Sequence, residues 1–253
     1  MNNTFFEKTL TICNEMHNRA MCQKERVISD FQRIITMPLT YKYGVGGINI
    51  HRGWYCPSFI LDIVIGNSSR GRLTNKCRAN TKYNYRYCFD NSDLLTVSEM
   101  YLDGVKRTSE YIIEEKDKRI GFTFLNDNKL LRYSEECYEE NFLISYRYID
   151  YFEVDNVISH LYFEQYKKEG SDLSCFITEY DKDVHVSQRE YSFTTDDEGF
   201  FLYYTVKKDE KEFLTGGVFG LNLNDMLLNM NDSRTELFKR DEIYSPKIRR
   251  KLI

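Results

Sequence analysis

The chain has 253 residues, of which 42% are hydrophobic and 29% charged, a composition typical of a folded globular protein that excludes a disordered chain. Its 35 basic and 39 acidic residues leave a net charge of −4. Nucleic-acid binding is therefore not expected, because it requires a basic surplus. Aromatic residues reach 15%, with 20 Tyr and 17 Phe against one Trp, and Tyr and Phe favour strands.

The seven cysteines are odd in number and follow no repeated spacing. The first residues lead into an amphipathic stretch rather than a continuous apolar one, and no run reaches the roughly 20 apolar residues that span a bilayer. These features predict reduced thiols, a cytoplasmic location, no membrane association and no bound cofactor.

Residues 5–36 have the helical period, because apolar side chains recur there at steps of three or four. Thr4 and Glu7 match a capping box at the start, and Pro38 stops the pattern. We expect one long helix, or two helices with a break near residues 21–23.

From about residue 40 the chain reads as short strands joined by turns. Clusters of Asn, Asp, Gly and charged residues recur roughly every ten to fifteen residues, a spacing typical of hairpins. The predicted turns are Asn91–Asp93, Asp103–Gly104, Glu115–Lys118, Asn126–Asn128, Glu139–Asn141, Asp155–Asn156, Glu169–Asp172, Asp181–Asp183, Asp196–Gly199 and Lys208–Lys211. Asp103–Gly104 is the strongest of them, since a type I′ turn requires positive φ and Gly tolerates it.

Between these turns polar and apolar residues alternate. Tyr83, Tyr85, Tyr87 and Phe89 fall on one face of a strand, and Tyr146 with Tyr148 repeats the pattern. Strict alternation predicts an antiparallel sheet with one buried and one wet face. The apolar run at residues 59–65 predicts a buried strand.

The predicted fold is mainly β (α+β): a long antiparallel β-meander sheet with an N-terminal helix and a short C-terminal helix. Residues 1–38 form the helical segment packed on the sheet, 39–215 the meander, and 216–253 the C-terminal helix and a basic tail. The helix is predicted from apolar spacing after residue 220, with Asn224 or Asp225 as its cap. One domain is expected overall.

Residues 83–166 contain a loose repeat. Tyr85-Arg86-Tyr87 and Tyr146-Arg147-Tyr148 each run through an Asn/Asp turn to a Leu, with Phe122–Leu130 between them. This segment resembles YD-repeat (Rhs-type) hairpins and small bacterial immunity or antitoxin-like β proteins. The turns hold Ser92, Asp93 and Asn128 where that family usually carries glycine. The resemblance implies a small free-standing sheet of the immunity-protein kind.

The densest group of reactive side chains is His51-Arg52-Gly53-Trp54-Tyr55-Cys56. As catalytic residues, His51, Arg52, Tyr55 and Cys56 would form a nucleophile-and-base site; the same cluster could instead form a stacking platform with Arg52 for phosphate. The nearby glycines do not match a dinucleotide fingerprint. The alternative is a loop whose Trp anchors the helix against the sheet.

Two smaller groups are weaker candidates. Cys13 and His17 lie four residues apart on the predicted helix, but no second ligand pair follows, so no metal site is predicted. Asp183 and His185 share one face of a strand, where a carboxylate can orient an imidazole for acid–base catalysis. Asp183 also has an ordinary role in a turn.

Acidic residues crowd the predicted turns. Those assigned to partner binding are Glu135, Glu136, Glu139, Glu140 and Asp155. An acidic surface steers a basic partner, such as a nuclease toxin, and raises its association rate. Solvated loop tips explain the same residues without any partner.

The leading hypothesis is a non-enzymatic protein-binding module, immunity-like or antitoxin-like, that occludes a protein partner through its sheet face or its acidic turns. The alternative is an enzyme that acts on a nucleotide or small polar substrate through the His51–Cys56 cluster. A structural subunit of a larger assembly is a third possibility. A deep pocket at that cluster would favour the enzyme.

Overall fold

The computed structural model describes residues 3–37, 39–47, 50–58, 60–61, 70–77, 82–140, 142–152, 157–169, 172–182, 186–195, 201–208 and 211–219. Its elements are α1 (Asn3–Ile34), β1 (Thr40–Val45), the short 3₁₀ helix η1 (Gly53–Tyr55), β2 (Arg72–Thr74), β3 (Tyr85–Phe89), β4 (Leu95–Leu102), β5 (Val105–Glu114), β6 (Lys118–Leu125), β7 (Leu130–Glu139), β8 (Phe142–Tyr151), β9 (Ile158–Glu169), β10 (Asp172–Asp181), β11 (Val186–Thr195), β12 (Phe201–Lys208) and β13 (Lys211–Phe219).

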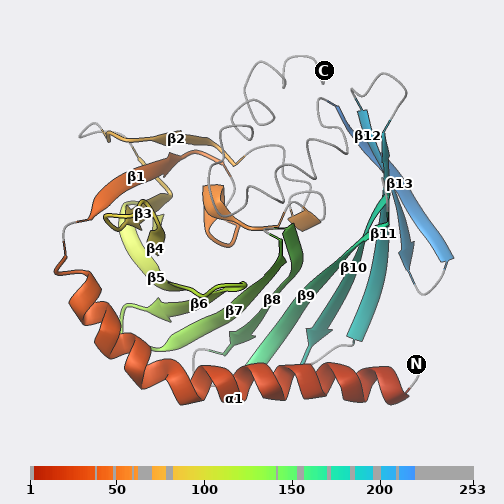
Figure 1. The fold of residues 1–253 in the computed structure, drawn as a ribbon, viewed down its shortest axis with the longest axis horizontal. Coiled ribbons are helices and arrows are strands. Elements are labelled where there is room, and N and C mark those ends of the chain that lie inside the picture. The colour runs from red at the N-terminus through yellow and green to blue at the C-terminus, as the bar shows by residue number, and fades with distance from the viewer. Residues whose placement is uncertain are drawn as a thin grey trace.

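The strands form one antiparallel sheet, which confirms the predicted meander. From β3 to β13 each strand pairs with the next in the chain, and β1 lies between β3 and β2 at the end of the sheet. Register shifts interrupt most of the hairpins, for example at Cys137/Tyr138 and Asp150/Tyr151. Such bulges bend and twist strands, and the sheet is strongly curved (Figure 1).

The predicted turns at Asn91–Asp93, Asp103–Gly104 and Asn126–Asn128 fall between consecutive strands, and so does Glu115–Lys118 as far as Asp117. Asp155–Asn156 and Asp196–Gly199 lie outside the described residues, and the remaining predicted turns are described only in part. At Asp103–Gly104 both residues have positive φ, 52° and 77°, as the type I′ prediction requires. Asp93 and Asn128 take the left-handed conformation in their turns, where the resembled family carries glycine. Asp and Asn tolerate this conformation better than other side chains, so these turns close without glycine.

Helix α1 covers the outer, convex face of the sheet (Figure 1). It is continuous through residues 21–23, so the single-helix form of the prediction is confirmed. Cys13, Met16, Ala20 and Val27 bury one helical stripe against β3 to β9. In the figure the segment with η1 lies on the opposite, concave side, which we call the inner face.

Central strands are buried on both faces, contrary to the expectation of one wet face. In β6 the residues from Arg119 to Phe124 are all buried. The outer face meets α1, and the inner face meets residues 50–58 and 60–61, which belong to the link between β1 and β2. Many of the tyrosines pack under this link rather than under the helix, among them Tyr138, Tyr146, Tyr148, Tyr162 and Tyr166.

Two further predictions were wrong in detail. Ile60 and Leu61 are buried but helical, not part of a strand. The amide of Leu61 donates to Ser58 Oγ at 2.8 Å, which is the bond an N-cap serine makes. β13 continues to Phe219, past the expected boundary at residue 215. The predicted C-terminal helix and basic tail lie outside the described residues.

Candidate functional site: a buried charge cluster on the inner face

Hydrogen bonds to backbone carbonyl groups hold the link between β1 and β2 on the inner face. Tyr85 donates from its hydroxyl to Ile50 O at 2.5 Å, and Tyr87 donates to Arg52 O at 2.9 Å. A Cβ at Gly53, whose φ is +52°, would meet the Tyr85 ring at 2.5 Å. The tyrosines that alternate along β3 therefore fix the position of the loop.

A second set of contacts holds the end of the same link. The guanidinium of Arg70 donates to the carbonyl oxygens of Trp54, Cys56 and Ser58 at 3.2, 2.6 and 2.5 Å. Arg70 is buried, and these bonds satisfy carbonyl groups of an irregular loop that would otherwise be costly to bury.

Arg52 is the centre of the cluster. Its side chain is fully buried and pairs with Glu110 on β5 (Nη2–Oε1, 2.8 Å) and with Glu136 on β7. Nη2 also donates to Ser134 Oγ at 3.2 Å. Arg119 on β6 contacts Glu136 at 3.6 Å and Glu114 at 2.7 Å, so the charges extend across three strands.

His51 joins this cluster through both ring nitrogens. Nε2 lies 3.0 Å from Glu110 Oε1, and Nδ1 contacts the hydroxyl of Tyr146. Burial lowers the pKa of His51 although the nearby Glu110 carboxylate opposes the effect. The neutral ring then donates a hydrogen bond from Nε2 to Glu110 and accepts a hydrogen bond from the Tyr146 hydroxyl at Nδ1.

The carboxylates stay ionised despite burial. Burial alone would raise the pKa of Glu110 and of Glu136. Arg52 lowers both pKa values, and it is helped by His51 at Glu110 and by Arg119 at Glu136. A buried carboxylate is tolerated only with such charged and hydrogen-bonded partners.

Strand pairing explains why these residues meet. One row across the inner face contains Glu114, Arg119, Glu136, Tyr146 and Glu164, each opposite the next. A second row contains Glu110, Thr123, Arg132, Asp150 and His160. Directly opposed side chains lie about 5 Å apart. Opposite charges therefore meet at Glu114–Arg119–Glu136 in the first row and at Arg132–Asp150–His160 in the second.

A separate hydrogen-bonded group surrounds Glu164 in the first row. Its carboxylate accepts from the hydroxyls of Tyr162 and Tyr166, each at 2.6 Å, and from Ser58 Oγ. This hydrogen bond from Ser58 anchors the link to β9. The inner face thus combines an apolar cluster with a buried network of hydroxyl, carboxylate and guanidinium groups.

Two of the four residues predicted for catalysis share one partner in the structure. His51 and Arg52 meet at Glu110. Tyr55 packs edge-on against Tyr87, 4.7 Å between centroids, and Cys56 is fully buried with its thiol 3.7 Å from Ser58 O.

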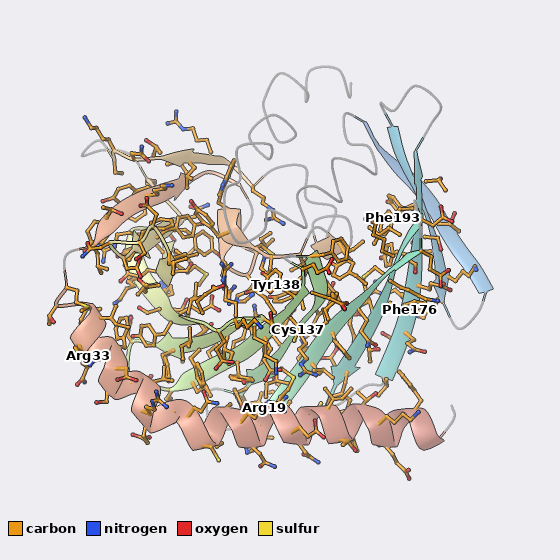
Figure 2. The ribbon with its side chains drawn as sticks, viewed as in Figure 1. Arg19, Arg33, Cys137, Tyr138, Phe176 and Phe193 are labelled. Atoms are coloured by element: carbon orange, nitrogen blue, oxygen red, sulfur yellow. The ribbon has the colours of Figure 1, made fainter. Side chains whose placement is uncertain are left out.

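The predicted acidic surface needs correction. Glu135 and Glu136 lie inside β7 and are buried, not in a turn. Glu135 faces α1, where Arg19 (Nε–Oε1, 2.7 Å) and Arg147 (Nη2–Oε2, 2.5 Å) bind its carboxylate. Figure 2 labels Arg19 on the helix side of the sheet and Tyr138 on the other side. Two adjacent glutamates in a strand point to opposite faces, and each face here is covered.

Glu139 and Glu140 are exposed, as predicted. Asp155, Asp183 and His185 lie outside the described residues. Cys13 is buried against the sheet, and His17 packs near Tyr151, 5.8 Å between ring centroids.

Sequence reasoning missed Glu110, Arg119 and Glu164, which carry much of the cluster. Each is a charged residue within a strand and next to apolar neighbours, which was a usable signal for a paired interior charge. Within the part of the chain that the structure describes, no group of three or more His, Cys, Asp or Glu side chains is arranged to hold a metal ion. No described helix has the length and apolar character needed to cross a membrane.

The chain matches no family model, no curated protein and no solved structure. The resemblance to YD-repeat hairpins stays a prediction.

The buried state of His51 predicts a pH effect on stability. Because its pKa is lowered on folding, the unfolded chain takes up the proton first as the pH falls. The contribution of the neutral ring to the free energy of unfolding is fully present above about pH 6.5. Below that pH the free energy of unfolding falls, with a limiting slope of about 1.4 kcal/mol per pH unit. Glu110 and Glu136 add a second loss below about pH 4.5, since their pKa values are also lowered on folding.

Urea unfolding between pH 4 and 8 measures this dependence. We expect His51→Gln to flatten the slope between about pH 5 and 6.5 and to leave the loss below pH 4.5 in place. Equal slopes for wild type and variant above pH 5 would show that His51 is not the titrating group.

Proposed function

We propose that the chain is a non-enzymatic binding module for a basic protein partner, immunity-like or antitoxin-like, which it engages through acidic turns at one end of the sheet. The observation that carries this proposal is the contrast between buried and exposed carboxylates. Glu110, Glu135 and Glu136 are bound by arginines. Exposed carboxylates that form no ion pair with any described residue include Glu115, Asp117, Glu139 and Glu140.

These four residues come from two neighbouring turns. The β5–β6 turn holds Glu115 and Asp117, and the β7–β8 turn follows Glu139. The amide of Tyr138 donates to Asp117 O at 2.9 Å, so the first turn contacts the end of β7. Lys116 lies in the first turn and Lys118 at the start of β6, and both reduce the net charge of the patch. The remaining negative surplus supports electrostatic steering of a basic partner.

Charge reversal at the second turn tests the proposal. The chain is immobilised and exposed to lysate of its source organism over a salt series, and captured proteins are quantified. We expect wild type to capture one basic protein in stoichiometric amount, and Glu139→Lys with Glu140→Lys to reduce the capture at least about tenfold at low salt.

The matched control reverses two exposed charges elsewhere, Glu7→Lys and Glu25→Lys on α1, and changes the net charge equally. This control should capture the partner like wild type. The proposal fails if no stoichiometric partner is recovered, or if both double variants reduce capture equally.

A further inference from the structure

Residues of the sheet line the space that the Arg52 side chain occupies. Arg52 itself belongs to the link between β1 and β2. Glu110 on β5 and Glu136 on β7 stand on either side of β6, and both bind the guanidinium. Ser134 on β7 adds a third acceptor at 3.2 Å. The acceptors thus sit on rigid strands, and the group they bind is delivered by a loop.

Gly121 on β6 makes the space between these acceptors. A Cβ at this position would overlap Glu110 Oε1, Ser134 Oγ and Arg52 Nη2. Gly121 has no positive φ, so the backbone there does not require glycine. The missing side chain leaves room for a planar group that lies over β6 and reaches both carboxylates.

The surroundings fix the charge of the site. Both carboxylates are buried and ionised. His51 also contacts Glu110, and Arg119 also contacts Glu136. Without the Arg52 guanidinium, two buried anions would share one remaining arginine and a neutral imidazole. The site therefore demands one cation that can donate several hydrogen bonds in a plane.

We propose that the inner face between β5 and β7 is a guanidinium-binding site, and that Arg52 occupies it as an internal ligand that locks the β1–β2 link onto the sheet. The ligand class is a guanidinium on a short alkyl stem. An ammonium group is a point donor and cannot span the two carboxylates in the same way.

The experiment empties the site and refills it. Arg52 has φ +58°, a left-handed conformation that glycine adopts without strain, so Arg52→Gly removes the side chain and preserves the backbone. N-Methylguanidinium is then titrated into the full-length variant at low millimolar concentrations, with melting temperature and calorimetric heat as readouts. We expect 1:1 saturable binding with Kd on the order of 1 mM and a melting temperature that rises with occupancy.

Methylammonium at the same concentration should bind at least about tenfold more weakly. Wild type should not bind methylguanidinium, because Arg52 fills the site. Arg52→Gly combined with Glu110→Gln should lose at least about tenfold in affinity. Arg189→Ala, which removes an arginine from a half-exposed pair with Glu179, serves as the matched control and should show no saturable binding.

If Arg52→Gly does not fold alone, the recovery of its native circular dichroism on addition of methylguanidinium is the readout. The proposal is overturned by any of three results: no saturable response of the variant, an equal response to methylammonium, or an equal response of wild type.

Discussion

Replacing Arg52 with methionine is expected to lower the free energy of unfolding by about 3–5 kcal/mol. Methionine preserves the unbranched stem of the side chain but removes the guanidinium, so Glu110 and Glu136 lose their shared cation. Both carboxylates are buried, and an uncompensated buried charge is among the costliest changes in a protein interior. Urea unfolding at pH 7.5 measures the loss.

The matched control for Arg52→Met is Arg189→Met, in the half-exposed pair with Glu179. Partly exposed ion pairs contribute little, so this variant should lose less than about 1 kcal/mol. A similar small loss for Arg52→Met would mean that water reaches the inner cluster.

Gly121→Ala is expected to destabilise the protein by about 3 kcal/mol, at the upper end for overpacking of a core. The new methyl group would occupy the position of atoms of Glu110, Ser134 and Arg52. Moving any of them breaks a hydrogen bond or ion pair of the cluster. The melting temperature and the urea midpoint measure this effect.

Gly44→Ala on β1 is the control for Gly121→Ala. A Cβ at Gly44 would lie 3.3–3.4 Å from Tyr85 and Tyr87 atoms, a tight but adjustable contact. We expect a change within about 1 kcal/mol. Equal effects of both alanines would show that the space over β6 is not specific to Gly121.

The elements of this fold were predictable because their signals are local. Asp103–Gly104 encodes its turn in two residues, and the apolar stripe of α1 repeats within each turn of the helix. The same approach failed at Ile60 and Leu61, since a short apolar run does not distinguish a strand from a helical turn.

The site was not predictable because its contacts are distant in sequence. Arg52 is 58 residues from Glu110 and 84 from Glu136. These partners follow from the register of β5 to β7 and from a loop that folds back over the inner face. Composition and spacing indicated His51 and Arg52 as unusual, but not that their role lies inside the sheet.

The same geometry explains the error at Glu135 and Glu136. A pair of glutamates near a predicted turn is normally solvated. Here β7 extends to Glu139, and its two faces meet α1 and the β1–β2 link, so each glutamate is buried on a different side. Glu139 and Glu140, beyond the covered part of the strand, are exposed.

A double-mutant cycle between Arg52 and Glu136 tests most directly whether this cluster holds the inner face together. Urea unfolding is measured for wild type, Arg52→Met, Glu136→Met and the double variant. Removing both residues leaves one buried carboxylate without its arginine instead of two, because Glu136 is gone, Glu110 keeps its hydrogen bond to His51, and Arg119 keeps Glu114. We predict that the double variant is more stable than the sum of the single losses implies, by at least about 2 kcal/mol. Losses that add within about 0.5 kcal/mol would contradict the account.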